Sequence, residues 1–347
     1  MRIYNLTIYR FIAALIIVFF HYGRDTILSQ HVFFVGTINF FFVLSGFVLT
    51  LTYLIKDMSF SRYFRARVYR IAPVYWLALL VTLLLQTEPI SKRAAVLSVF
   101  FLQSWFPPYP ATLNGPGWYL SVMMFFYLIF PQILAYIKFK QLQPGKLLAL
   151  SSVVWLFTQI ILTNLLNSPF YKPYPSIPHD LIFYFPISHF SSFLLGIAGA
   201  YLYLDFREKD FPSYMIILGL ILSFAGCFVV LNYGGWINRQ IGFALPYSAG
   251  VASPLFLALI LFSSFAEKRF SGEWLNNSVF NLLGQASYAV YIFQLPFQKF
   301  YLRYLSQLVN TRPELDFYYY LVFLIVFSIA INKFFETPVR CLLFEKF

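Results

Sequence analysis

Charged side chains are scarce in this sequence, and acidic ones are scarcer still. Only 11% of the 347 residues are charged, with 13 Asp and Glu against 25 Lys and Arg, whereas 60% are hydrophobic. A water-soluble globule of this length needs a larger polar surface than these residues can supply. The composition therefore excludes a soluble protein and makes lipid the solvent for most of the chain.

Cysteine is nearly absent as well. The two cysteines, Cys227 and Cys341, are too few for a disulfide scaffold or a metal cage, so we expect no metal. No small-residue cleavage site follows His21 at the end of the first apolar run, so we expect this first segment to stay in the protein rather than to be removed as a signal peptide.

Long apolar stretches, in contrast, recur from one end of the chain to the other. Because a bilayer core of about 30 Å needs roughly 20 apolar residues per helix, the sequence predicts an all-α fold, a polytopic transmembrane helical bundle of about ten helices. We expect a single membrane domain over residues 1–347 and no soluble extracytoplasmic module. The predicted spans are 8–27, 32–55, 71–87, 117–137, 147–166, 184–204, 213–232, 247–266, 285–305 and 317–335.

The basic residues predict the orientation of this bundle. The apolar segment 94–106 is too short to cross with confidence and runs into a proline-rich stretch. If it does not cross, and if Arg2 and Arg10 are inside, most of the 25 Lys and Arg lie on the inner side. The positive-inside rule then predicts that both termini are cytoplasmic. It also explains most of the net charge of +12 without a nucleic-acid partner.

One basic cluster exceeds what orientation requires. The stretch 61–76 reads SRYFRARVYRIAPVYW and places Arg62, Arg65, Arg67 and Arg70 just before a helix that we expect to begin near Pro73. The cluster could set topology and contact anionic lipid headgroups. It could equally form a cytoplasmic phosphate-binding patch, because guanidinium groups pair well with phosphate oxygens.

The first span contains two ionisable residues, which are costly inside a membrane and therefore suggest a function. Arg10 and His21 are eleven residues apart, which is about three helical turns, so they share one face and are separated by roughly 16 Å along the axis. His21 could act as a general base near neutral pH. The alternative is structural, with His21 a packed or interfacial residue and Arg10 an interfacial anchor.

Two further stretches combine glycine with aromatic residues. Residues 40–47 read FFFVLSGF, where the Ser-Gly pair favours close packing of two helices over a local break. Residues 114–121 read NGPGWYLS, a pattern that can line a cavity at membrane depth or mark the membrane interface.

Taken in order along the chain, these stretches resemble the motifs of membrane-bound acyltransferase family 3, the family of polysaccharide O-acetyltransferases and related membrane proteins. The similarity covers the whole chain and rests on six motifs. They are Arg10-x10-His21, FFxLSGF at 41–47, the RxxRIxPxYW-like stretch from Arg67 to Trp76, GPxWYLS at 115–121, SYxxYxxxxP at 287–296 and ExP at 336–338.

The resemblance implies transfer of an acyl group, commonly acetyl, from cytoplasmic acetyl-CoA to a hydroxyl of an extracytoplasmic carbohydrate. It assigns the acyl-transfer site to His21 and Arg10 and makes Arg67 and Arg70 candidate contacts to the phosphates of the donor. The acceptor would be a lipid-linked glycan or a surface polysaccharide. The protein would be a multi-pass protein of the inner or plasma membrane, with the lipid bilayer as its other partner.

Three positions depart from the family pattern, because this chain has Met123 and Asn39 where an acidic residue is usual and Gln294 where a histidine is usual. Neither Met123 nor Gln294 can exchange a proton near neutral pH. A member with altered or lost activity therefore stays a possibility. A transporter of a lipid-linked or sugar substrate is another, although the inverted repeats typical of transporters are not visible in the sequence.

Overall fold

In the computed structural model of this chain, residues 3–23, 26, 36–54, 59–270, 277–309 and 313–345 are described. Parts of the predicted spans 8–27 and 32–55 lie outside these residues, as do Arg2, Arg24, Lys56, Arg312 and Lys346. Every regular element in the described ranges is a helix. The all-α prediction is therefore confirmed for them.

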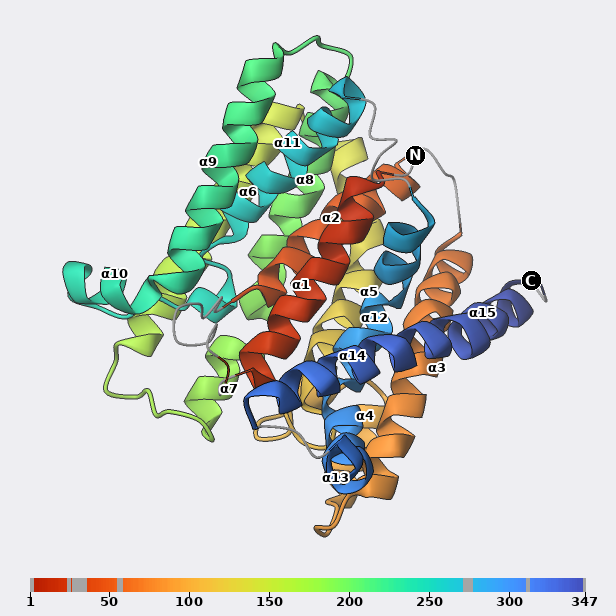
Figure 1. Ribbon diagram of the computed structural model, residues 1–347. Helices are drawn as coiled ribbons and strands as arrows, with labels where there is room; N and C mark the ends of the chain where they lie inside the picture. The colour runs from red at the N-terminus through yellow and green to blue at the C-terminus, as the bar shows by residue number, and fades with distance from the viewer. Residues whose placement is uncertain are drawn as a thin grey trace.

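Each predicted span overlaps one long helix (Figure 1). The long helices are α1 (Asn5–Tyr22), α2 (Ile38–Tyr53), α3 (Phe60–Leu85), α5 (Trp118–Phe139), α6 (Pro144–Leu166), α8 (Phe190–Phe206), α9 (Ser213–Asn232), α11 (Ser253–Arg269), α12 (Ser278–Phe300) and α14 (Pro313–Ile331). The short helices are α4 (Lys92–Val99), α7 (Ile177–Phe183), α10 (Gly234–Ile241), α13 (Ser306–Val309) and α15 (Thr337–Glu345).

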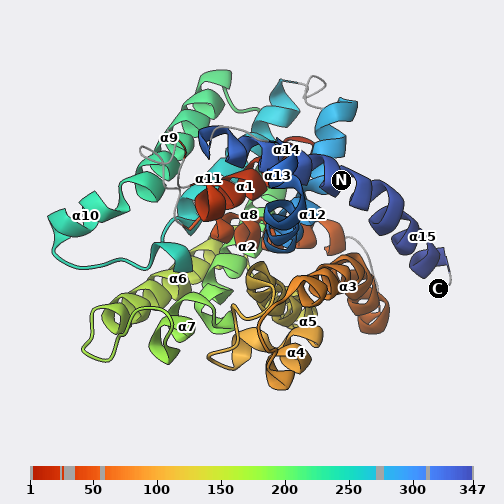
Figure 2. The same cartoon turned by 60° about the horizontal axis from the view of Figure 1, so that its bottom comes forward.

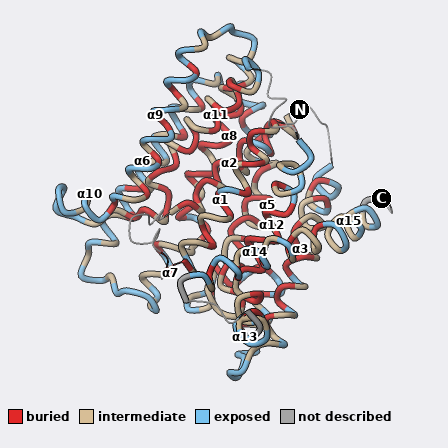
Figure 3. Tube along the Cα trace, viewed as in Figure 1, coloured by how far each residue is buried: buried red, intermediate tan, exposed pale blue. Residues whose placement is uncertain are grey.

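Seven helical stretches within the described ranges are long and apolar enough to cross a membrane, and α2 is apolar but shorter. They show that the chain is a multi-pass membrane protein; the count of about ten crossings and the cytoplasmic termini stay predictions. The segment 94–106 carries the eight-residue α4, which is too short to cross. Large apolar side chains such as Leu218, Ile221 and Phe224 of α9 are exposed, as expected where lipid is the solvent. Figure 3 shows exposed stretches along α9.

The predicted start of the third span near Pro73 is wrong. Helix α3 begins at Phe60, thirteen residues earlier, and Pro73 lies inside it. Proline removes one backbone donor, but membrane helices tolerate it because neighbouring groups satisfy the freed carbonyl. The arginine cluster therefore forms the first part of helix α3. Arg67 and Arg70 are three residues apart in this helix, so they share one face of it.

The core is formed by helices that are distant in sequence. Helix α2 packs along α8, and α1 packs along α12. Figures 1 and 2 show α9 at one edge of the bundle and α3 at the opposite edge, with α1, α2, α8 and α12 between them. Arg10 and His21 therefore lie on a central helix, α1, whereas Arg67 and Arg70 lie on α3 at the edge.

The α2–α8 crossing depends on two glycines. A Cβ atom on Gly46 would lie 2.2 Å from the Phe193 carbonyl oxygen, and one on Gly196 would lie 2.0 Å from the Val43 carbonyl oxygen. The glycine of the FFxLSGF motif thus permits close backbone approach, as expected from the sequence.

We expect Gly46→Val to destabilise the protein by about 3 kcal/mol, because the added side chain overlaps backbone that cannot rotate away. The measurement is thermal unfolding of the detergent-solubilised protein. Gly145→Ala is the matched control, since a Cβ there meets nothing within 4 Å, and it should shift stability by less than about 0.5 kcal/mol. An unchanged midpoint for Gly46→Val would refute the role given to this crossing.

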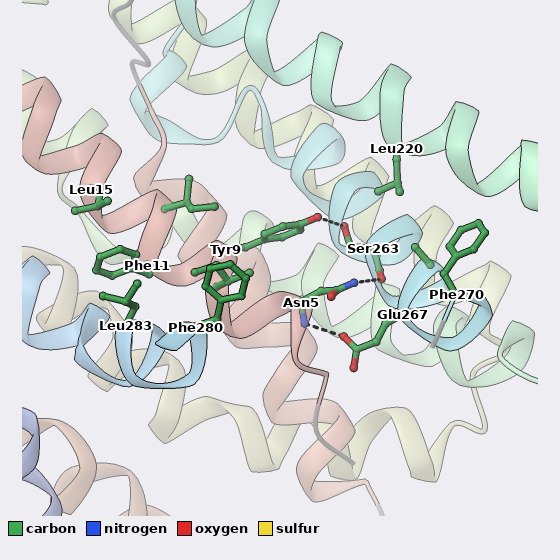
Figure 4. Close-up of a pocket in the computed structure, with 13 residues that line it drawn as sticks. Asn5, Tyr9, Phe11, Leu15, Leu220, Ser263, Glu267, Phe270, Phe280 and Leu283 are labelled. Carbon is green, nitrogen blue, oxygen red and sulfur yellow. Dashed lines mark hydrogen bonds between the residues drawn. The ribbon is translucent and has the colours of Figure 1, made fainter. Parts of the chain in front are cut away.

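The first turn of α1 is fixed to α11 (Figure 4). The Glu267 carboxylate accepts hydrogen bonds from the backbone N–H groups of Tyr4 at 2.8 Å and Asn5 at 2.7 Å. These are two of the donors that a helix N-terminus leaves without a helical acceptor. The Asn5 amide also donates to the Ser263 carbonyl at 3.1 Å. This anchor fixes the helical turn that precedes Arg10 against α11.

A cavity of about 590 Å³ lies beside this anchor, between α1, α9, α11 and α12 (Figure 4). Its lining is mostly apolar, and the described residues around it include neither an arginine nor a histidine. This cavity has few polar side chains that could take part in acyl transfer, so it is not the candidate active site.

Candidate active site

A second cavity, of about 470 Å³, lies inside the bundle and gathers most of the basic motif residues. Arg10 of α1 and Arg67 and Arg70 of α3 line it together with Arg340 of α15. Apolar and aromatic residues of α2, α5 and α12 complete the wall. We call this space the arginine cavity, and the end of the bundle on which it lies the arginine end.

The arginine cavity has an excess of positive charge. Its lining holds four guanidinium groups and one carboxylate, that of Glu336. Among the side chains that the structure describes, no carboxylate lies within 4 Å of any of these four arginines. Glu336 instead accepts a hydrogen bond from the Asn332 amide at 3.0 Å. Glu336 still interacts electrostatically with Arg10, Arg70 and Arg340, but one carboxylate cannot balance four guanidinium groups. The remaining positive charge favours an anionic ligand, and guanidinium groups suit phosphate oxygens in particular.

Arg67 is held in place by Tyr53 at the end of α2. One terminal nitrogen of Arg67 donates to the Tyr53 hydroxyl at 2.8 Å, and the guanidinium carbon lies 5.2 Å from the centre of the Tyr53 ring. The Arg67 Nε atom is buried without a hydrogen-bond partner in the described structure. A guanidinium group that is held in one orientation and has an N–H without an acceptor is suited to donate a hydrogen bond to a ligand oxygen.

His21 lies at the other end of α1, which we call the histidine end. It does not line the arginine cavity, and the helical rise separates it from Arg10 by roughly 16 Å. Its side chain is exposed, and its Nδ1 atom lies 2.7 Å from Oε1 of the buried Gln294 on α12. The structure therefore groups Arg10 with Arg67 and Arg70, not with His21.

Aromatic rings separate the two ends. Phe41 of α2 and Tyr119 of α5 line the arginine cavity. Their ring centres lie 6.3 and 5.5 Å, respectively, from that of Tyr291 on α12. The Tyr291 carbonyl in turn accepts a hydrogen bond from the Gln294 side chain. We call Phe41, Tyr119 and Tyr291 the aromatic layer, which connects the wall of the cavity to the partner of His21.

The three departures from the family pattern occupy different places. Met123 is buried and lines the arginine cavity, so the cavity has one carboxylate fewer than the family pattern would give it. Gln294 contacts His21 directly. Asn39 lies elsewhere, with its Oδ1 atom 3.3 Å from Nδ1 of the buried His189. Two of the three departures therefore bear on the candidate site.

Sequence reasoning did not assign Arg340, Glu336, Tyr53 or Gln294 to the site. Glu336 of the ExP motif lines the cavity one turn before Arg340. The ExP motif could have indicated this pair, because residues four apart share a helix face. No local pattern points to Tyr53, since its role depends on how α2 packs against α3.

A known protein family matches nearly the whole chain. The acyltransferase domain of acyltransferase family 3 matches residues 3–332, which is nearly the whole chain. Comparisons with curated proteins and with solved structures gave no match. With a family match of this extent, the chain belongs to acyltransferase family 3 and is a membrane acyltransferase.

Proposed function

We propose that this protein is an O-acyltransferase of the inner or plasma membrane. It moves an acyl group, in the first instance acetyl, from cytoplasmic acyl-CoA to a hydroxyl of an extracytoplasmic carbohydrate. The observation that carries the proposal is that α1 presents Arg10 to the arginine cavity at one end and His21 at the other.

The arginine cavity would hold the phosphates of the donor. Arg67 and Arg70 project from one face of α3, and Arg10 and Arg340 approach from α1 and α15. Acyl-CoA carries several phosphate charges on a long flexible arm, and a cavity with four arginines and one carboxylate complements such a ligand. The positive-inside rule favours the cytoplasm as the side on which this cavity opens.

His21 would act as the general base. Its Nε2 atom accepts the proton of the acceptor hydroxyl as that oxygen attacks the acyl carbonyl. The C–S bond of the thioester breaks, the thiolate leaves, and the proton passes from Nε2 to the sulfur. For this step the thioester arm must pass the aromatic layer, whose ring-to-ring contacts can be displaced without breaking a covalent bond.

The test is mass analysis of the surface glycans of cells with and without the gene. The proposal predicts that a set of glycan masses falls by the mass of one acyl group when the gene is removed, and that the wild-type gene restores them. Identical glycan masses in the two strains would contradict the proposal. A transporter would be indicated by loss of the whole glycan rather than of its acyl groups.

A further inference from the structure

The contact between His21 and Gln294 defines which nitrogen of His21 can act as a base. The 2.7 Å distance joins His21 Nδ1 to the side-chain oxygen of Gln294. Gln294 is completely buried, whereas the His21 side chain is exposed. The fixed member of the pair is therefore Gln294, and the reachable member is His21.

The orientation of the Gln294 amide follows from its second hydrogen bond. Its Nε2 atom donates to the Tyr291 carbonyl at 2.7 Å. Exchanging the oxygen and nitrogen of the amide would place two acceptors against each other at that distance, so Oε1 must face His21. An amide oxygen can only accept, and the hydrogen of the contact must therefore sit on His21 Nδ1. In the neutral ring the lone pair then belongs to Nε2.

The backbone around Gln294 is held by neighbouring elements. Pro296 has no N–H, so the Ile292 carbonyl four residues earlier lacks its helical donor. The Asn114 amide fills that place at 3.0 Å. The Tyr320 hydroxyl of α14 donates to the Gln294 carbonyl at 2.7 Å. The SYxxYxxxxP and GPxWYLS regions are thereby joined, and Gln294 has little freedom to move away from His21.

We infer that Gln294 is a positioning residue that holds His21 in the Nδ1–H tautomer and presents Nε2 as the basic nitrogen toward the acyl acceptor. This inference rests on the proposed function. Gln294 itself gains and loses no proton, because the Nδ1–H donates to the amide oxygen both before and after Nε2 is protonated.

Because the Gln294 side chain is uncharged, it does not favour the protonated form of His21. A carboxylate in its place would stabilise the protonated ring, as an anion beside an imidazolium does, and would reduce the fraction of His21 that can act as a base near neutral pH. Two phenols face the described part of the pair: the Tyr22 ring of α1 lies 5.8 Å from the His21 ring, and the Tyr320 hydroxyl of α14 donates to the Gln294 carbonyl. Gln294 thus orients the His21 ring without adding a charge beside it.

The test is a comparison of kcat and of its pH profile for three variants of the full chain in proteoliposomes, with acetyl-CoA and an acceptor glycan. Gln294→Leu removes the acceptor atom and should lower kcat about 10- to 100-fold with the KM for acetyl-CoA unchanged. Gln294→Glu restores the acceptor atom that faces His21 but places a second acceptor against the Tyr291 carbonyl, so it should regain only part of kcat, with the acid limb of the profile moved to higher pH. Gln298→Leu, one turn further along α12 and partly exposed, is the matched control and should behave as the wild type.

Two results would overturn this role of Gln294. One is a Gln294→Leu protein with the wild-type kcat and pH profile. The other is equal loss of kcat in Gln294→Leu and Gln294→Glu at normal KM for acetyl-CoA, which would mean that the amide only fills space. Wild-type protein without any acyl transfer would instead overturn the proposed function, and this role with it.

Discussion

Replacing His21 with alanine lowers kcat for acyl transfer by at least about 100-fold and leaves the protein folded in the membrane. The size follows from loss of general-base catalysis, which contributes typically about 10²- to 10⁴-fold. Folding survives because the His21 side chain is exposed, so its removal opens no cavity in the core. The measurement is the rate of acyl transfer from acetyl-CoA by equal amounts of membrane-inserted protein.

The matched control for this prediction is His179→Ala. His179 lies on the short helix α7 and contacts the rings of Tyr174 and Phe183 rather than any residue of the candidate site. It should keep the wild-type rate. A His21→Ala protein that still acylates surface glycans at the normal level would refute the role of His21.

Replacing Arg70 with alanine raises the KM for acetyl-CoA about 10- to 100-fold and changes kcat much less. A hydrogen bond to a charged group contributes about 1.5–3 kcal/mol, and each 1.4 kcal/mol is tenfold in affinity. Arg70 is the sharpest test among the cavity arginines because, unlike Arg67, it has no hydrogen bond within the described structure that its removal would break. Arg70→Lys should lie between the wild type and Arg70→Ala, because an ammonium keeps the charge but not the fork of donors.

Arg62 provides the control for Arg70. It lies on the same helix α3, is exposed, and does not line the arginine cavity. Arg62→Ala should therefore leave the KM for acetyl-CoA unchanged. Equal KM values for wild type, Arg62→Ala and Arg70→Ala would contradict phosphate binding by the arginine cavity.

The positions of the helices could be predicted from sequence because hydropathy is a local property. A run of about 20 apolar residues predicts a membrane-spanning helix without reference to the rest of the chain. The start of α3 could not be found in this way, since Phe60 to Arg70 is a basic, amphipathic stretch whose helical state depends on packing, and Pro73 suggested a boundary that neighbouring helices remove.

The composition of the site could be predicted only in part. Arg10 and His21 share one helix, so their spacing is fixed by the helical rise alone. Which residues face them is decided by helices far away in sequence: Gln294 is 273 residues from His21, and Arg340 reaches the same cavity as Arg10. The sequence identified Gln294 as a departure from the family pattern, but only the packing of α1 against α12 shows that it contacts His21.

The most direct test of the account is acyl transfer by the purified protein in oriented proteoliposomes, with acetyl-CoA supplied on one side and an acceptor glycan on the other. The account predicts acylated glycan only when acetyl-CoA is on the side of the arginine end and the glycan on the side of the histidine end, with one thiol released for each acyl group transferred. Acylation that requires the opposite arrangement, or movement of substrate without thioester cleavage, would contradict it.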